Sequence, residues 1–143
     1  MRALLETCVV LDALQSREPF CEAAQQIFLA AANKHFMGFL TAKSATDIYY
    51  LLHRHTHSNQ ESRRVLNTLF NLFELLDTAG MDCRHAISSD ISDFEDAVMV
   101  ESAARSGMDC IVTRNLKDYV KSSVNVYAPD AFLKQIEAEN AEG

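Results

Sequence analysis

The stretch Asp90–Tyr119, DISDFEDAVMVESAARSGMDCIVTRNLKDY, contains the signals that decide the fold. Its first half places small apolar residues, Ala97 and Val100 among them, at the spacing of one helix face. Gly107 marks the end of this helix, because glycine readily adopts the left-handed conformation that follows a helix C-terminus. The run Cys-Ile-Val at 110–112 then predicts a short buried strand. Helix, tight turn and strand together form half of an α/β unit.

Polar residues flank both predicted elements of this stretch. Asn115 and Asp118 follow the strand, at the edge of an open parallel sheet where ligands bind. Asp93 is explained as a cap at the helix N-terminus, where a carboxylate is stabilising. Asp96 lies three residues further on and can point toward the sheet, where a carboxylate needs a partner or a metal. The acidic residues at the start of this helix can therefore be explained either by helix capping or by a binding site.

Length and charge limit the class of protein. The 143 residues suit one domain, 1–143, with a sizeable core, and we expect the polar stretch 137–143 to be a frayed tail. The formal net charge of −7 argues against a protein that binds nucleic acid by electrostatics alone. An enzyme whose acidic groups hold divalent cations stays open, because the cations cancel part of that charge.

The sequence contains no sign of export or membrane insertion. No apolar run approaches the ~20 residues of a membrane helix, and Glu6 interrupts the apolar N-terminus, which makes it a poor signal peptide. The four cysteines are scattered and form no CxxC pair. This pattern predicts reduced thiols in a cytoplasmic protein.

Short apolar strands alternate with longer amphipathic helices along the chain. Strands are expected at residues 3–5, 36–40, 74–76, 110–112 and 125–127. Besides the helix of the opening stretch, helices are expected near residues 9–14, 19–33, 41–55, 60–73, 81–87 and after 129. We expect Pro19 in a first helical turn and both Phe20 and Phe70 facing the core. The alternation predicts an α/β fold with a central parallel sheet covered by helices on both faces.

Acidic side chains lie next to several of these strands. Glu6 follows the first strand, and Asp47 lies on the helix after the second. Asp96 opens the helix before the fourth strand, and Asn115 and Asp118 follow that strand. Since the carboxyl ends of parallel strands share one edge of a sheet, we expect these groups to lie close together. Oxygen-rich sites of this kind suit Mg²⁺ or Mn²⁺.

Five segments, in this order, resemble motifs of the PIN-domain family, in the bacterial branch grouped with VapC-type toxins. They are LLETCVVLDALQSREPF (4–20), TAKSATDIYYLLHR (41–54), DFEDAVMVESA (93–103), CIVTRNLKDY (110–119) and YAPDAFL (127–133). The resemblance implies a three-layer α/β/α PIN-like fold with a central parallel sheet. It also implies a Mg²⁺- or Mn²⁺-dependent ribonuclease that hydrolyses RNA as the toxin of a toxin–antitoxin pair. Its protein partners would be an antitoxin and a second copy of the chain in a homodimer.

The resemblance implies catalytic roles for four acidic residues, Glu6, Asp47, Asp96 and Asp118. Three of them, Glu6, Asp96 and Asp118, would hold the metal, and Asp47 would orient the attacking water.

Supporting roles are implied for neighbours of these positions, namely Thr7, Asp12, Asp93, Thr113, Arg114 and Asn115. The two threonines and Arg114 are candidates for phosphate contacts, and a surface ion pair is an equal alternative for Arg114. Asp12 either supports the site or caps a turn.

Two residues depart from the family pattern, which has Asp at the first acidic position and Asn two residues later. Glu6 and Cys8 stand there instead. One extra methylene displaces a carboxylate by ~1.5 Å, and Mg²⁺ demands closer geometry than Mn²⁺. We therefore expect weak cleavage that is better with Mn²⁺. The alternative is a catalytically weak or inactive PIN-like module that binds RNA or a protein partner.

Two further patterns lie on the expected helix 41–55. His53, His55 and His57 form an H-x-H-x-H run, but no cysteine or carboxylate joins it and a helix C-terminus favours histidine. We therefore expect a structural or solvated role for this run. Tyr49 and Tyr50 either belong to the core or stack on an RNA base.

Overall fold

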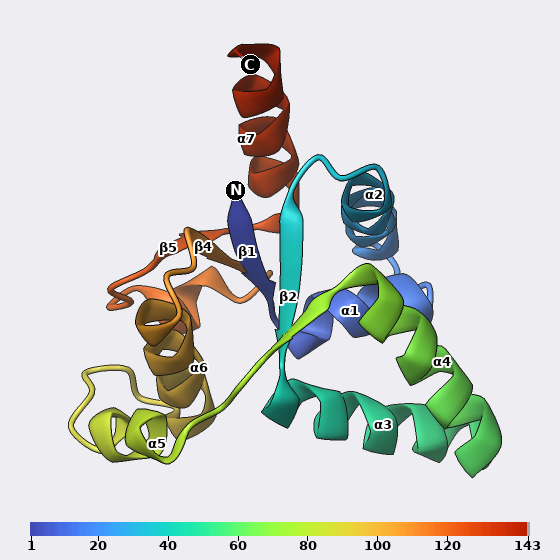
Figure 1. Ribbon diagram of the computed structural model, residues 1–143, viewed down its shortest axis with the longest axis horizontal. Helices are drawn as coiled ribbons and strands as arrows, with labels where there is room; N and C mark the ends of the chain where they lie inside the picture. Colours follow the sequence, from blue (N-terminus) through green and yellow to red (C-terminus); the bar gives the residue numbers. More distant parts are fainter. Residues whose placement is uncertain (143) are drawn as a thin grey trace.

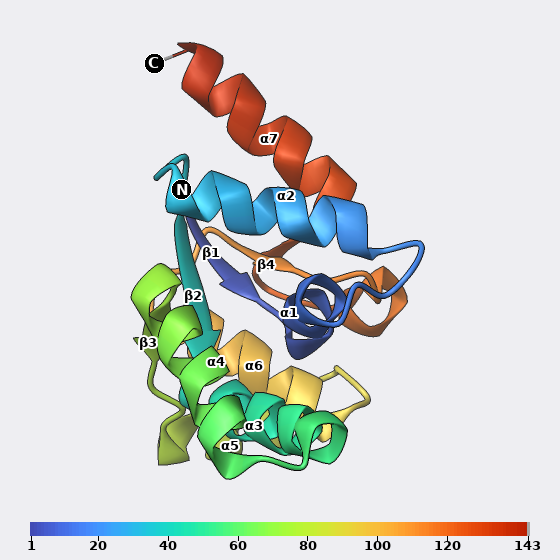
Figure 2. The same ribbon diagram turned by 90° about the vertical axis from the view of Figure 1, so that its right-hand side faces the viewer.

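The computed structural model describes residues 1–142. Its centre is a five-stranded sheet in which every neighbouring pair of strands is parallel, in the order β3-β2-β1-β4-β5. The strands are β1 (Arg2–Leu5), β2 (Met37–Thr41), β3 (Glu74–Leu76), β4 (Cys110–Val112) and β5 (Asn125–Tyr127). All of them therefore end at one edge of the sheet, toward which β1 and β2 point in Figures 1 and 2.

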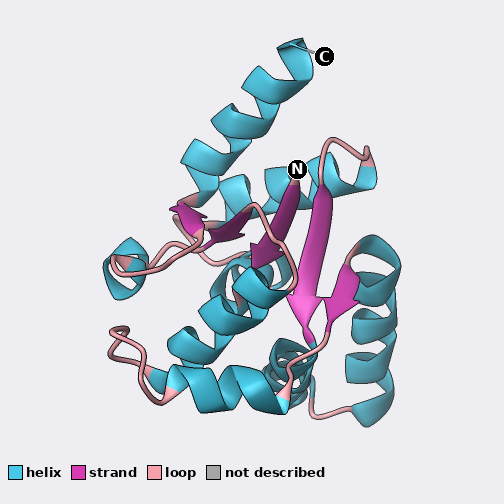
Figure 3. Cartoon of the chain, turned by 60° about the vertical axis from the view of Figure 1, so that its left-hand side comes forward, coloured by secondary structure: helices cyan, strands magenta, loops and turns pink. Residues whose placement is uncertain are grey.

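Helices cover both faces of this sheet and form the expected three-layer α/β/α arrangement (Figure 3). The helices are α1 (Thr7–Leu14), α2 (Cys21–Ala32), α3 (Ala42–Thr56), α4 (Asn59–Leu72), α5 (Gly80–Ala86), α6 (Phe94–Arg105) and α7 (Pro129–Glu142). One face packs against α1, α2, α4 and α7, and the other against α5 and α6. From the carboxyl edge, α3 joins the first layer through Ile48 and Leu52. The prediction of a parallel sheet between two helical layers is confirmed.

The central strand β1 illustrates how the sequence specifies the layers. Leu4 packs in one cluster with Ala97 and Val100 of α6, whereas Ala3 and Leu5 belong to the cluster under the opposite helices. Successive side chains of a strand point to opposite faces of a sheet. Because both faces are covered, a parallel strand in this position needs an unbroken apolar run.

The starts and ends of the helices beside the carboxyl edge are defined by single residues. Thr41 Oγ1 accepts the backbone N–H of Ser44 at the start of α3, over 3.0 Å. Asp93 Oδ1 accepts the N–H of Asp96 at the start of α6, also over 3.0 Å. Gly107 follows α6 with a φ of +70°, as predicted. These caps set the directions in which α3 and α6 leave the sheet.

Three expectations about side chains were wrong. Pro19 lies in the turn before α2, which begins at Cys21, and not in a helical turn. Phe20 and Phe70 are 38% and 39% exposed, respectively. Phe20 lies outside the core because it covers an arginine, as described below. Phe70 lies on the outer side of α4, whose Leu69 faces the core.

The end of the chain also differs from expectation. The stretch from Glu137, expected to be frayed, continues α7 to Glu142, and Gly143 lies outside the described residues. The loop after β4 contains an unpredicted 3₁₀ helix, η1 (Leu116–Tyr119). All four cysteines are free thiols, as predicted. None of the helices in the part of the chain described is long and apolar enough to span a bilayer.

Candidate active site

A pocket of about 520 Å³ opens between α3 and α6 at the carboxyl edge of the sheet. Glu6 lines it from the end of β1, Asp47 from α3, and Asp96 from the first turn of α6. In Figure 1, α3 and α6 lie on either side of the ends of β1 and β2. Three of the four acidic residues expected at the site therefore share one pocket. The fourth, Asp118, is exposed on η1 and lies outside the lining.

A buried tyrosine lies between two of these carboxylates. The Tyr119 hydroxyl donates to Asp96 Oδ1 over 2.9 Å, and Tyr119 is only 2% exposed. Burial raises the pKa of this phenol, and the charges of Glu6 and Asp96 raise it further. Tyr119 therefore remains protonated and serves as a neutral hydrogen-bond donor to Asp96.

Asp96 is an acid without a neutralising cation. Burial is the largest cause that raises the pKa of its carboxyl to about 6, and the charges of Asp93, Glu6 and Asp118 add to it. The hydrogen bond from Tyr119 opposes the shift without cancelling it. None of the ion pairs among residues 1–142 includes Asp96. The carboxylates of the pocket therefore repel one another, and a bound cation would relieve that repulsion.

Glu6 is held on one side only. Its Oε1 accepts a hydrogen bond from Asn115 Nδ2 over 3.4 Å. Its Oε2 is buried and has no hydrogen-bond partner among the described residues. Buried polar atoms are nearly always paired in native proteins, so this carboxylate oxygen is free to accept a further donor or a cation.

Two residues beside Glu6 position Asn115. Thr113 is fully buried, and its Oγ1 accepts the backbone N–H of Asn115 over 3.0 Å. A phosphate contact for Thr113 was therefore a wrong expectation, because the residue has no exposed surface. Cys8 Sγ lies 3.9 Å from Asn115 Nδ2. Burial and then Glu6 raise the pKa of the Cys8 thiol to about 11, so the thiol is neutral at pH 7.

Asp47 faces the pocket from α3 and is already paired. Lys43 Nζ lies 2.6 Å from Asp47 Oδ2, one helical turn away, and 3.2 Å from Glu95 Oε1 on α6. This bridge links α3 and α6 across the carboxyl edge. It also brings a cation to the pocket, which sequence reasoning missed although Lys43 and Asp47 have the i,i+4 spacing of a helical ion pair.

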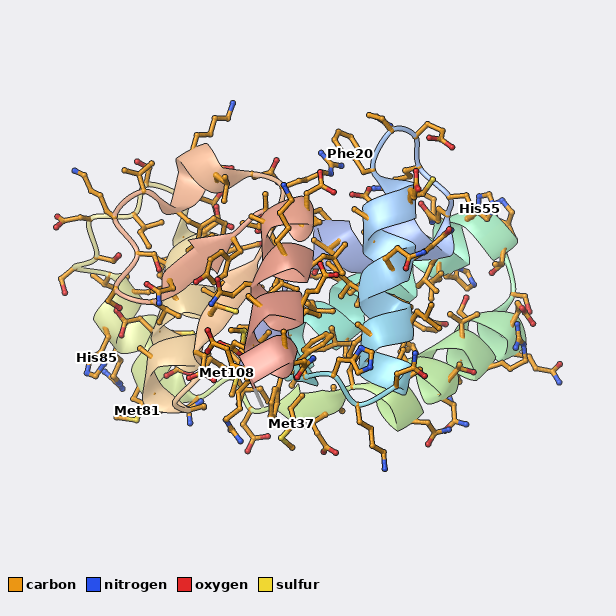
Figure 4. All side chains as sticks on the ribbon, turned by 90° about the horizontal axis from the view of Figure 1, so that it is seen from above. Phe20, Met37, His55, Met81, His85 and Met108 are labelled. Carbon is orange, nitrogen blue, oxygen red and sulfur yellow. The ribbon has the colours of Figure 1, made fainter. Side chains whose placement is uncertain are left out.

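Arg114 takes part in an ion pair, which was one of its two expected roles. Its Nε donates to Asp12 Oδ2 over 2.8 Å, and Asp12 is only 1% exposed. The guanidinium carbon lies 4.1 Å from the centre of the Phe20 ring, and Figure 4 shows Phe20 at the loop before α2. Asp12 thus supports the site indirectly, because it anchors the loop that carries Asn115. Of the expected phosphate contacts, Thr7 alone lines the pocket.

The residues of the pocket can accept a divalent cation. As the side chains stand, no three His, Cys, Asp or Glu groups within residues 1–142 are arranged to hold a metal ion. Mg²⁺, however, is usually bound through one or two carboxylates together with waters and substrate phosphates. Glu6 and Asp96 supply two such carboxylates, one with an orphaned oxygen. The donor set therefore fits a hard cation, with Asp118 as a further acid nearby.

The histidine run lies apart from this pocket. His53, His55 and His57 occupy the C-terminal end of α3, where His57 adopts a left-handed conformation with a φ of 55°. None of them lines the pocket, and Figure 4 shows His55 at the outer end of the molecule. The run is therefore part of the helix end.

Sequence reasoning also missed Tyr119 as part of the site. The family pattern places an aromatic residue directly after the last acidic position, which here is Asp118. The pattern accepts Phe or Tyr, so the motif gave no reason to assign a role to the hydroxyl. Its role becomes visible only when α6 places Asp96 within 2.9 Å of it.

Comparisons with known proteins identify the family of the chain and agree with its fold. The sequence profile of the PIN domain matches residues 2–117. No protein with a curated description matches the chain.

Among solved structures, the fold is similar to that in a complex of VapBC2 from Rickettsia felis bound to a DNA fragment from their promoter. The identity is 13% over 90% of this chain and 98% of the other, with a TM-score of 0.67. A toxin–antitoxin complex from Klebsiella pneumoniae is 18% identical over 89% of this chain and 97% of the other, with a TM-score of 0.65.

A third structure, VapBC-1 from nontypeable Haemophilus influenzae, is 12% identical over 91% of this chain and 99% of the other, with a TM-score of 0.67. At these identities the likeness concerns the fold, whereas the profile match covers most of the chain. The chain therefore belongs to the PIN-domain family.

Proposed function

We propose that this chain, as a single PIN-like domain, is a Mg²⁺- or Mn²⁺-dependent endoribonuclease and the toxin of a toxin–antitoxin pair. Its substrate is cytoplasmic RNA, and its protein partners are an antitoxin and a second copy of the chain. One observation carries the proposal. Glu6 and Asp96 share a pocket at the carboxyl edge of a PIN fold, neither forms an ion pair among residues 1–142, and one buried Glu6 oxygen has no hydrogen-bond partner there.

The proposal gives roles to the acidic residues and to the two residues that hold them. Glu6 and Asp96 hold the cation, with Asp118 as the third acid. When bound, Mg²⁺ or Mn²⁺ supplies positive charge that stabilises the phosphoryl oxygens and lowers the pKa of water. Asn115 and Tyr119 hold the two carboxylates in place.

On the α3 side of the pocket, Asp47 and Lys43 would contact the attacking water and the phosphate. Asp47 orients the water that attacks the phosphorus in line, and its carboxylate can accept a hydrogen bond from that water. Lys43 holds Asp47 and offers a positive charge to a non-bridging phosphate oxygen. Thr7 lines the pocket, and its hydroxyl would donate a hydrogen bond to a phosphate oxygen.

A second candidate is a non-catalytic PIN-like module that binds RNA or a protein partner. Two observations favour it: Cys8 presents a neutral thiol where the family pattern has an amide, and the present side-chain positions form no complete ligand set among residues 1–142. The two candidates differ in whether RNA is cut.

A single-turnover cleavage assay on single-stranded RNA, with Mn²⁺ or Mg²⁺, decides between them. We expect slow cleavage that is faster with Mn²⁺, and a loss of roughly 100-fold or more in Asp96→Asn, the scale for removing one transition-state-stabilising group. Asp90→Asn, an exposed carboxylate in the loop before α6, is the matched control and should cleave normally. A wild type that binds RNA but does not cut it with either metal would favour the module. Undiminished cleavage by Asp96→Asn would contradict the assigned role of Asp96.

A further inference from the structure

The pocket has an apolar half that the proposed chemistry does not use. Beyond the carboxylates it is lined by Tyr50 and Leu51 from α3 and by Phe94, Val98 and Met99 from α6. Tyr50 is 68% exposed and Phe94 is 48% exposed. Two solvent-exposed aromatic rings therefore line the same hollow as the acidic site, and ligand pockets commonly combine apolar walls with a few polar groups.

The exposed Tyr50 ring packs against its neighbour Tyr49, which is itself fixed by further contacts. The Tyr49 ring packs edge-on against it, with centroids 5.6 Å apart and an angle of 78°. Tyr49 is itself stacked on His53, and its hydroxyl donates to Asn59 Oδ1 on α4. An exposed aromatic that is already positioned loses little freedom when a flat ligand stacks on it.

Phe94 lies on the α6 side of the pocket, and its position is fixed by the start of that helix. It is the first residue of α6, directly after the cap residue Asp93. The cap hydrogen bond to the N–H of Asp96 therefore fixes the backbone from which the Phe94 ring projects. Both rings are thus supplied by rigid helix positions on either side of the pocket.

Charged residues on α3 lie on both sides of Tyr50. Lys43, Asp47, Tyr50 and Arg54 recur at the spacing of one helix face and all line the pocket. Lys43 lies toward the carboxylates, through its bridge to Asp47 and Glu95. Arg54 forms no ion pair within residues 1–142. From position 43 to position 54 the helix rises about 16 Å, which is long enough for more than one nucleotide.

We propose that Tyr50 and Phe94 form a stacking subsite for one unpaired RNA base next to the cleaved phosphate, with Arg54 on a flanking phosphate. The inference rests on the proposed ribonuclease function and adds the residues that would bind a base and a flanking phosphate of the RNA beside the acidic site. Unpaired bases expose the faces on which aromatic side chains stack, whereas bases in a duplex do not. A chain with a net charge of −7 gains little from electrostatics alone, so stacking supplies the affinity.

The test measures binding separately from cleavage. A fluorescein-labelled single-stranded hexaribonucleotide is titrated in EDTA and followed by anisotropy. We expect Tyr50→Ala and Phe94→Ala each to weaken binding about tenfold, while Tyr50→Phe binds like wild type because it keeps the ring. Phe70→Ala is the matched control, since Phe70 is an exposed aromatic on α4 outside the pocket and should have no effect.

A spectroscopic arm reports stacking directly. With 2-aminopurine in the oligonucleotide, wild type should quench its fluorescence on binding, and Tyr50→Leu should quench it less because it keeps apolar volume but lacks the ring. In single-turnover cleavage, Tyr50→Ala and Phe94→Ala should each raise the RNA concentration at which the rate is half-maximal, whereas Tyr50→Phe should not.

The outcomes separate this inference from the proposed function. A wild type that binds with the predicted variant pattern but never cleaves would retain the subsite and reject the ribonuclease. A wild type that cleaves while Tyr50→Ala and Phe94→Ala bind and cleave normally would reject the subsite and retain the ribonuclease. If wild type does not bind the hexaribonucleotide, the subsite is also rejected.

Discussion

A cluster of polar side chains that includes a carboxylate lies at each end of helix α6, and the pKa shifts of the two carboxylates have opposite directions. Near its C-terminus, Asp82 of α5 is 1% exposed and accepts hydrogen bonds from Ser102 Oγ at 2.7 Å and from Arg105 Nε at 2.8 Å. Arg105 is the main cause that lowers the pKa of Asp82 to about 2. At its N-terminus, burial raises the pKa of Asp96 to about 6. One cluster is complete as it stands, and the other is not.

The difference separates a carboxylate that the chain neutralises by itself from carboxylates that it leaves without a cation partner. The chain supplies Arg105 and Ser102 where α5 must be joined to α6, and every Asp82 oxygen has a partner. At the other end it supplies only a neutral phenol and an amide, and leaves Glu6 Oε2 unpaired. Carboxyl groups whose pKa is raised by burial and by neighbouring acids are concentrated at functional sites.

The largest expected effect comes from breaking the complete cluster. Arg105→Met leaves Asp82 buried without its cation, so we expect about 3 kcal/mol less stability, or ~10 °C in Tm, at pH 7. Because the folded-state pKa of Asp82 lies below its unfolded value, the pair stabilises the fold above pH ~4 and loses its effect as pH falls toward 2. Thermal melts from pH 7 to pH 2 measure this change.

Arg84→Met is the matched control for this prediction, because Arg84 is exposed on α5 and belongs to none of the ion pairs among residues 1–142. Equal melting temperatures for the two variants would contradict the view that Asp82 depends on Arg105.

A smaller effect of opposite sign is expected at the incomplete cluster. Asp96→Asn removes a repelled charge, so the variant should be more stable than wild type at pH 7.5 without metal. Solvent screening of this half-buried group leaves a gain of about 1 kcal/mol, or ~3 °C. Since the folded-state pKa of Asp96 lies above its unfolded value, wild type regains this stability as pH falls from about 6 to 4.

Thermal melts of Asp96→Asn against Asp90→Asn between pH 4 and pH 7.5 measure the gain. A gain that does not shrink on acidification would show that it arises from something other than the Asp96 charge. A loss of stability at pH 7.5 would contradict the repulsion altogether.

The layers of the fold could be predicted because their signals are local. Each strand is a short apolar run. The residues that mark the start and the end of α6, Asp93 and Gly107, lie within a few residues of the helix in the sequence. The exposure of a side chain was predicted wrongly where it depends on a contact with a residue far away in the sequence. Phe20, for example, covers Arg114, a residue 94 positions away in the chain.

The convergence of Glu6, Asp47 and Asp96 on one pocket could be predicted because the carboxyl ends of parallel strands lie at one edge of the sheet. Their partners could not. Asp82 meets Arg105 only because α5 packs on α6, and Arg114 meets Asp12 across 102 positions. The contrast between a complete and an incomplete cluster therefore requires the three-dimensional structure.

The central claim is that the Glu6–Asp96 cluster is completed by a divalent cation. The most direct test is the Tm of metal-free protein titrated with Mn²⁺ at pH 7.5, for wild type, Asp96→Asn and Asp82→Asn. At a Mn²⁺ concentration about three times Kd, linkage predicts about 0.8 kcal/mol, or ~2 °C, of stabilisation. The shift should be present in wild type, kept in the destabilised Asp82→Asn, and absent in Asp96→Asn. No shift in wild type at millimolar Mn²⁺, or an equal shift in Asp96→Asn, would contradict the claim.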